Sequence, residues 1–119
     1  MKPAIQLPML AGATALLLLT GCHHTLKSKP LSQLTPTEMQ GHAVFQSHCA
    51  VCHHPNSEQK LIGPGLLGMF QKPYLPSGAP ATDARVRFTI LRGKNVMPPF
   101  ANVLDEQQIH DLLAYLHTL

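Results

Sequence analysis

The 119-residue chain has no tryptophan, and its other aromatic residues are four phenylalanines and two tyrosines. Large aromatic side chains supply much of the buried area in most cores. A small domain that lacks them usually depends on disulfides, a metal or another large buried group. The composition therefore predicts that a group other than the side chains completes the core.

Cysteine is also scarce, with three residues in the whole chain. Cys22 closes an apolar run near the start, so only Cys49 and Cys52 lie within the body of the chain. A disulfide between these two would close too short a loop to stabilise the fold much. A cofactor in the core is favoured over disulfides.

Charged residues are few, at 13% of the chain, with nine Lys and Arg against six Asp and Glu. This balance does not suggest nucleic-acid binding, which needs a basic stripe. It leaves room for a modest basic face that would meet an acidic protein partner.

Only the beginning of the chain carries a long hydrophobic run. Lys2 precedes an apolar stretch rich in Ala and Leu, which ends in small residues before Cys22. A charged start, an apolar run and small residues are typical of a secretory signal peptide. The run is shorter than the about 20 residues of a membrane span and is broken by Pro8. We therefore expect residues 1–21 to be a signal peptide.

The sequence LTGC at residues 19–22 resembles the lipobox of bacterial lipoproteins. The resemblance implies cleavage before Cys22 and lipid on its thiol and amino group, and two or three acyl chains hold a protein firmly at a membrane. The alternative is that Cys22 is removed with the signal. We expect Cys22 to be lipidated, residues 22–34 to form a flexible tether, and residues 35–119 to form one domain.

Capping signals predict three helices. The sequence TPTE at residues 35–38 supplies an N-cap, a first-turn proline and a reciprocal Glu, so a helix is expected from residue 36 to about 48. A second helix is expected over residues 83–92, with Gly93 ending it.

The third helix is predicted to start near Asp105, with Gln108 completing a capping box. Its apolar residues recur with helical spacing; they are Ile109, Leu112, Leu113 and Leu116. Residues 55–81 are rich in Pro and Gly and predict a loop. No segment alternates like a strand, so the fold class is predicted to be all-α.

Residues 49–54 read CAVCHH, a pattern compatible with a redox disulfide, half a zinc site or haem attachment. A thioredoxin-like centre needs a strand-to-helix setting, which is not predicted here. A zinc site needs a further ligand from a distant histidine. Haem attachment needs only these residues, since two thiols add to the two vinyl groups and the adjacent histidine binds iron. We favour haem on Cys49 and Cys52 with His53 as ligand, and His54 as a surface residue.

The iron needs a sixth ligand if the site carries electrons without further chemistry. Met39 and Met69 are expected to be packing residues. Met97 lies in an extended loop before Pro98 and Pro99, and these prolines reduce the entropy lost in holding the thioether. We therefore predict Met97 as the sixth ligand.

From residue 36 to 119 the chain resembles the class I cytochromes c. GHAVFQSHCAVCHH resembles the opening helix and haem motif of that family, NVMPPF its axial methionine loop and DLLAYL its final helix. GPGLLG resembles the segment whose proline carbonyl accepts the ring N–H of the proximal histidine, here Pro64 and His53. The resemblance implies three main helices around one covalent haem c, with Leu112 and Tyr115 of the last helix crossing Gly41 of the first.

Two features of the haem environment are also predicted. Porphyrin burial is assigned to four apolar residues: Leu66, Phe88, Phe100 and Leu112. Without tryptophan the propionate partners stay open, and the candidates are Tyr74, Arg85, Arg92 and Asn95.

The expected function is single-electron transfer by an exported protein that is lipid-anchored, faces the periplasm or the cell exterior and is not an enzyme. Its expected partners are a redox donor and acceptor, themselves membrane-bound, with no small-molecule substrate. Two alternatives remain open: a haem subunit of a larger oxidase or dehydrogenase, and a haem sensor or enzyme in which Met97 is displaceable.

Overall fold

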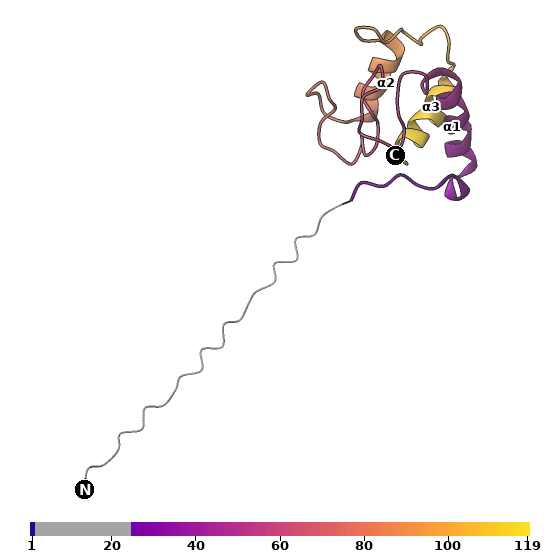
Figure 1. Cartoon of the computed structure of the whole chain (residues 1–119). Helices are drawn as coiled ribbons and strands as arrows, with labels where there is room; N and C mark the ends of the chain where they lie inside the picture. The colour runs from indigo at the N-terminus through magenta and orange to yellow at the C-terminus, as the bar shows by residue number, and fades with distance from the viewer. Residues whose placement is uncertain (2–24) are drawn as a thin grey trace.

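The computed structural model describes residue 1 and residues 25–119, so the predicted signal peptide and Cys22 lie outside the described residues. The described part contains a short 3-10 helix, η1 (Leu31–Gln33), and three α-helices, α1 (Pro36–His48), α2 (Asp83–Arg92) and α3 (Glu106–Leu116). Within residues 25–119 no strand forms, and only two isolated β-bridges occur. The predicted all-α class and the three main helices are confirmed (Figure 1).

The predicted capping box begins α1. The Thr35 N–H donates to the Glu38 carboxylate at 2.7 Å, and the Glu38 N–H donates to the Thr35 hydroxyl at 3.3 Å. The Lys29 ammonium lies 2.7 Å from the same carboxylate. This hydrogen bond, followed by that from Thr35, lowers the pKa of Glu38 below its usual value, so the ionised side chain is stabilised in the folded state.

The same local chemistry begins the other two helices. The Thr82 hydroxyl accepts the Arg85 N–H at the start of α2. At the start of α3, the Asp105 carboxylate accepts the Gln108 N–H at 2.8 Å, and the Gln108 side chain accepts the Asp105 N–H at 3.0 Å. These bonds satisfy N–H groups that the first turn of a helix leaves without partners.

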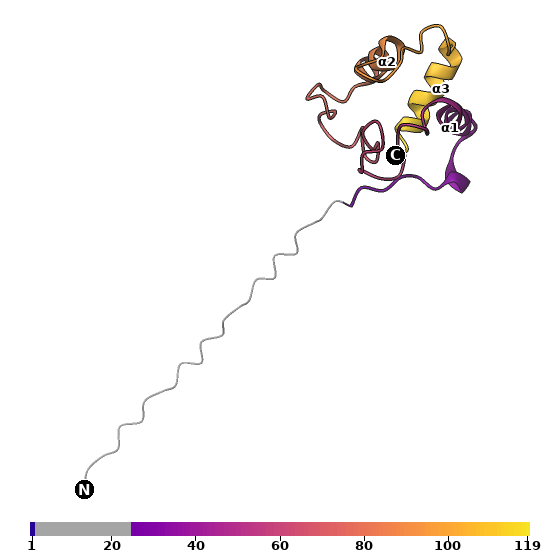
Figure 2. The same cartoon turned by 45° about the horizontal axis from the view of Figure 1, so that its top comes forward.

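Helices α1 and α3 pack against each other, as Figures 1 and 2 show. Their contact is centred on Gly41, where a Cβ would lie 1.9 Å from the Asp111 carbonyl oxygen and 2.8 Å from the Tyr115 Cβ. One turn later, the fully buried Phe45 ring lies 5.4 Å from the Tyr115 ring, centroid to centroid. The predicted crossing of the first and last helices at Gly41 is present, and only glycine fits there.

The buried core lies where the inward faces of the three helices meet. It consists of Phe45, Val86, Ile90, Leu104, Ile109, Leu112, Tyr115, Leu116 and Leu119. Most of these residues belong to α3 or follow it, in line with the apolar spacing predicted for the last helix.

The segment before α1, predicted as a tether, makes specific contacts with the domain from Leu26 onward. The Lys29 N–H donates to the Thr118 carbonyl at 2.6 Å. The Leu26 side chain covers Gly68, and Leu34 packs against the core. Any free linker must therefore be shorter than residues 22–34, and the division into signal, tether and domain stays a prediction.

The C-terminal residues hold the long loop that joins α1 to α2. The His117 ring stacks on Phe70 with centroids 3.8 Å apart, and its Nε2 lies 2.6 Å from an Asp83 carboxylate oxygen. The Gln71 side chain donates to the Leu119 carbonyl at 2.9 Å. These contacts fix the loop that forms one wall of the site.

Candidate functional site

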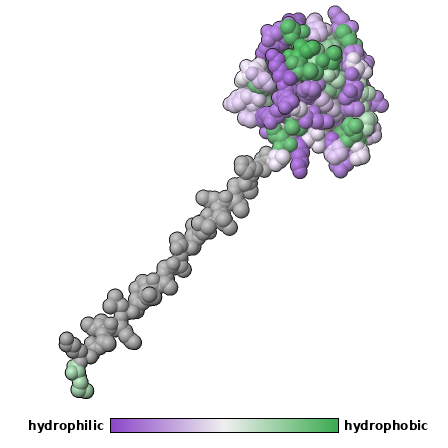
Figure 3. All heavy atoms as spheres, viewed as in Figure 1, coloured by the Kyte–Doolittle hydropathy of each residue, from purple (hydrophilic) through white to green (hydrophobic). Residues whose placement is uncertain are grey.

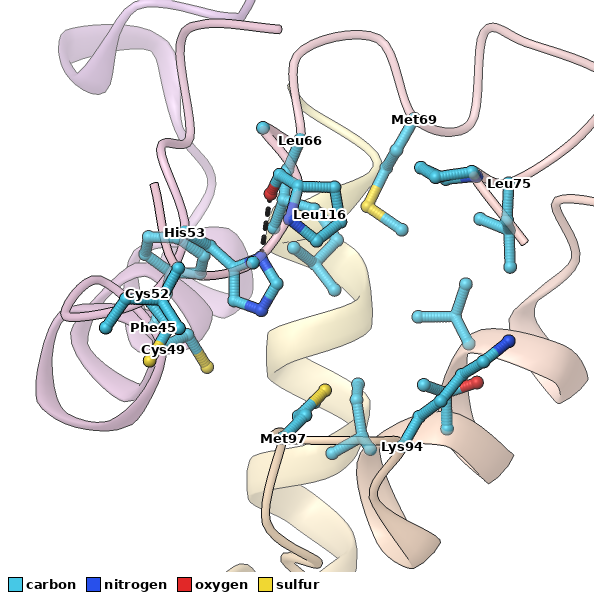
Figure 4. A pocket seen from close by; sticks show the side chains of 18 of the residues that line it. Phe45, Cys49, Cys52, His53, Leu66, Met69, Leu75, Lys94, Met97 and Leu116 are labelled. Atoms are coloured by element: carbon cyan, nitrogen blue, oxygen red, sulfur yellow. Dashed lines mark hydrogen bonds between the residues drawn. The ribbon is translucent and has the colours of Figure 1, made fainter. Parts of the chain in front are cut away.

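A cavity of about 980 Å³ lies between the three helices and the two loops that join them (Figure 4). Apolar side chains from every part of the domain line it, including Phe45, Leu66, Leu75, Ile90, Phe100, Leu112 and Leu116. Its size is at the upper end of the range for ligand-binding clefts. The cavity corresponds to the missing core volume that the scarcity of aromatic residues predicted.

The CxxCH stretch forms one end of this cavity. Cys49 caps α1 by donating its N–H to the Phe45 carbonyl at 2.8 Å, and the N–H groups of Cys52 and His53 donate to the Cys49 carbonyl, each at 3.0 Å. This turn brings both thiols and the imidazole to the cavity wall, and both cysteines are unpaired.

The protonation behaviour of Cys49 differs from that of a redox centre. Burial, followed by the nearby Cys52, raises the pKa of the Cys49 thiol to about 11. Reactive CxxC cysteines have lowered pKa values because the thiolate is the nucleophile. The raised pKa argues against disulfide exchange at this pair, in line with the predicted haem attachment.

A hydrogen bond to the Pro64 carbonyl orients the His53 ring. The Nδ1–H donates to this oxygen at 2.8 Å, as the dashed line in Figure 4 shows. With the proton on Nδ1, the lone pair of Nε2 is free for a metal. The bond predicted by the family resemblance is present in the structure.

Gly63 is a supporting residue that sequence reasoning did not single out. Its N–H donates to the Cys52 carbonyl at 2.8 Å, and a Cβ at this position would lie 2.3 Å from the His53 Cε1. Because glycine has no side chain, the backbone at residue 63 can pack directly against the imidazole ring. Its place directly before Pro64 in the GPG sequence is a signal that could have identified it.

Replacing Gly63 by alanine is expected to rotate or displace the imidazole, because the methyl group overlaps the ring. We expect a loss of stability of about 1–3 kcal/mol, typical of overpacking, with a weakened iron–histidine bond. The unfolding midpoint and the resonance Raman iron–histidine stretch of the reduced protein measure these effects. Gly78→Ala is the control for an added methyl, because nothing lies within 4 Å of a Cβ there, although its positive φ carries its own cost. An unchanged histidine stretch in Gly63→Ala would contradict the supporting role.

A tight turn after α2 carries Met97 to the cavity. Gly93 ends the helix with φ of 71°, a conformation that favours glycine. Lys94 and Met97 then exchange backbone hydrogen bonds of 3.1 and 2.9 Å. Figure 4 shows Met97 and His53 reaching the same cavity from different elements.

One predicted haem contact is wrong. Leu66, Phe100 and Leu112 line the cavity, but Phe88 does not, and its side chain is 56% exposed. Val86 and Ile90 point inward from α2, and two residues correspond to about half a turn of helix. Phe88 therefore lies on the outer face.

Of the four residues predicted as candidates to bind the haem propionates, two line the cavity and two do not. Tyr74 and Asn95 line the cavity, whereas Arg85 and Arg92 lie outside it on α2. His54, predicted as a surface residue, does not line the cavity and is half-buried.

The sequence did not predict several polar residues that line the cavity, including Lys60, Lys72 and Lys94. Lys94 precedes Met97 by three residues, so a loop that delivers one to the cavity delivers the other. Met69, predicted as packing, also directs its side chain into the cavity (Figure 4).

Comparison with known proteins identifies the family. Residues 36–116 match the family model described as cytochrome C oxidase, cbb3-type, subunit III. The chain belongs to the cytochrome c family.

Individual cytochromes of known sequence are similar over most of the domain. Cytochrome c6 of Thermosynechococcus vestitus is 30% identical over 91 residues, which cover 72% of this chain and 78% of the relative. A cytochrome c6-like protein of Nostoc sp. is 32% identical over 91 residues, with the same coverage. The crystal structure of cytochrome c6 from the diatom Phaeodactylum tricornutum superimposes with a TM-score of 0.53 at 30% identity, covering 66% of this chain and 88% of that one.

As a cytochrome c, the protein binds one covalent haem c with its iron, transfers electrons between redox partners and is a carrier rather than an enzyme. The residues present fit this group: two free thiols, an imidazole with Nε2 available and an apolar cavity meet at one place. Covalent haem of this type is attached outside the cytoplasm, which agrees with the predicted export. Among residues 25–119, no helix is long and apolar enough to cross a membrane.

Proposed function

We propose that this protein is an exported, membrane-anchored class I cytochrome c, with one haem on Cys49 and Cys52 and iron bound by His53 and Met97. The observation that carries the proposal is that all four side chains line a single apolar cavity. They come from the end of α1, the turn after it and the loop after α2. Nothing in the local sequence of any one segment requires this meeting.

When bound, haem iron supplies the single-electron change between the ferrous and ferric states. The protein residues set the conditions for that change. Pro64 holds a proton on the Nδ1 of His53, and the turn at Gly93 presents the Met97 thioether. If His53 and Met97 both hold the iron, no substrate would reach the metal.

The surroundings favour a high reduction potential. A thioether ligand favours the ferrous form relative to a second histidine. Buried apolar side chains such as Phe45, Ile90 and Leu112 disfavour the extra charge of the ferric state. The expected role is therefore to accept electrons from a donor of lower potential and pass them to an acceptor.

Membrane anchoring is supported by the lipobox resemblance that ends at Cys22. The contacts of Leu26 and Lys29 with the domain leave only a short linker after Cys22. A short linker raises the effective concentration of the domain near membrane-bound partners. We therefore infer that both the donor and the acceptor are membrane-bound redox proteins.

The anchor is tested by fractionating cells that produce the wild type or Cys22→Ser. The wild-type c-type visible spectrum is expected in the membrane fraction, and the variant with the same spectrum in the soluble exported fraction. Wild-type haem protein in the soluble fraction would remove the anchor from the proposal and leave electron transfer intact. Rapid binding of carbon monoxide by the reduced wild type would instead favour the sensor or enzyme alternative.

A second candidate is a haem subunit of a larger oxidase. The description of the matching family model favours it, since that family is defined on an oxidase subunit. Gentle detergent extraction separates the two cases: a permanent subunit co-purifies with its complex in fixed proportion, whereas a mobile carrier is recovered alone.

A further inference from the structure

The outer face of α2 carries a groove that the haem site does not use. Its volume is about 300 Å³, and it is lined by Arg85, Phe88 and Thr89 of the helix, by Lys94, and by Ser77 and Ala79 of the preceding loop. Three of these residues, Ser77, Thr89 and Lys94, also line the haem cavity. The groove therefore borders the cavity.

The lining of the groove carries positive charge from Arg85 and Lys94. No acidic residue lines the groove. The nearest acids along the sequence already have partners: Asp83 lies 2.6 Å from His117, Glu106 lies 2.6 Å from Arg87, and the Asp105 carboxylate accepts the Gln108 N–H at 2.8 Å.

In contrast, three cations on this side form no ion pair within residues 25–119, and these are Arg85, Arg92 and Lys94. Because the haem cavity does not take up the two arginines, their charges remain available to an external group.

An exposed aromatic ring shares this groove with Arg85 and Lys94. Phe88 is 56% exposed, and the Arg92 guanidinium lies 6.0 Å from its ring centroid. Figure 3 shows a hydrophobic patch beside hydrophilic residues at the top of the domain, the side on which Figure 1 places α2. Arginine and aromatic residues that meet in a concave patch are typical of the central residues of protein interfaces.

We propose that this α2 groove, lined by Arg85, Phe88 and Lys94 and bordered by Arg92 beside the Phe88 ring, binds an acidic segment of a protein partner. Carboxylates of the partner would pair with the cations, and one apolar side chain would cover Phe88. The proposal rests on the proposed function in one respect: it makes this partner a redox protein, held beside the haem cavity by the shared residue Lys94.

The test uses the holoprotein and a defined probe. Reduced, nitrogen-15-labelled holoprotein is titrated with a short peptide of glutamate and leucine, and with the same peptide carrying glutamine in place of glutamate. The acidic peptide is expected to shift amide signals in residues 77–94, and the neutral peptide is not. Arg85→Gln with Arg92→Gln is expected to weaken binding about fivefold or more, since paired charges carry the affinity. Phe88→Ser is expected to weaken it as well.

The matched control is Lys27→Gln with Lys29→Gln, which removes the same charge outside both the groove and the haem cavity and is expected to change binding less than about twofold. Equal weakening in the control, or shifts spread over the surface, would overturn the proposal in favour of a net-charge effect. So would binding to phosphatidylglycerol vesicles without peptide binding, or self-association that the arginine variant abolishes. The visible spectrum and potential of the same samples report on the haem site separately, so failure of the groove is distinguishable from failure of electron transfer.

Discussion

Replacing Cys49 and Cys52 together by alanine is expected to yield a haem-free chain that does not fold. The native cavity of about 980 Å³ would then be empty. At about 24 cal/mol per Å³, a rigid cavity of that size would cost on the order of 20 kcal/mol. This is an upper bound because the mouth is open at exposed residues such as Val51 and Val96. Even half of this cost is comparable with the about 5–15 kcal/mol that stabilises a typical domain.

Near- and far-ultraviolet circular dichroism of the purified haem-free double variant tests this expectation. We expect loss of the near-ultraviolet signal and binding of a hydrophobic dye, the signs of a collapsed chain without fixed packing. Cys22→Ser is the control, since it removes a thiol but keeps both residues at the cavity. A haem-free domain with cooperative unfolding and native near-ultraviolet signal would show that the side chains alone suffice.

Replacing Met97 by alanine is expected to keep the haem attached but change its electronic properties. The far-red sulfur-to-iron charge-transfer band of the oxidised protein should disappear, because no thioether reaches the metal. The potential is expected to fall by on the order of 0.1 V or more, within the about 0.8 V that axial ligands span. The reduced variant should also bind carbon monoxide, which the wild type should resist. Visible spectroscopy and a redox titration measure these changes.

Met69→Ala is the matched control, because Met69 lines the same cavity and was predicted to be a packing residue. It is expected to keep the charge-transfer band and to lose stability by about 2–5 kcal/mol, as for other truncations of large apolar residues. Persistence of the band in Met97→Ala, together with its loss in Met69→Ala, would transfer the ligand role to Met69.

The helices were predictable because their signals are local. The boxes of Thr35 with Glu38 and of Asp105 with Gln108 join residues three apart, and both are present. Gly93 ends α2 for an equally local reason, its positive φ. The prediction for Phe88 was wrong because it rested on residue type alone. Val86 and Ile90 point inward from the same helix, so Phe88, midway between them, points outward.

The remaining site features depended on long-range packing. The contacts of Leu26 with Gly68 and of Lys29 with Thr118 join segments that are distant in sequence. The residues before 35 have no periodic pattern that would predict such contacts. The contact between Gly63 and the His53 ring likewise depends on how the loop after the CxxCH turn folds back against the imidazole. Such approaches are set by the packing of the whole chain and carry no pattern in neighbouring residues.

The amino-acid sequence by itself determined the helices and the all-α class, and it carries the prediction of haem at Cys49, Cys52 and His53, because each depends on a few consecutive residues. Only the tertiary structure decided which side chains share the cavity and which remain outside. It brings Met97 and Lys94 to the cavity and leaves Arg85 on the outer face, free to form a groove. The physical reason is that helix faces are set by local geometry, whereas cavities and grooves arise where segments distant in sequence pack together.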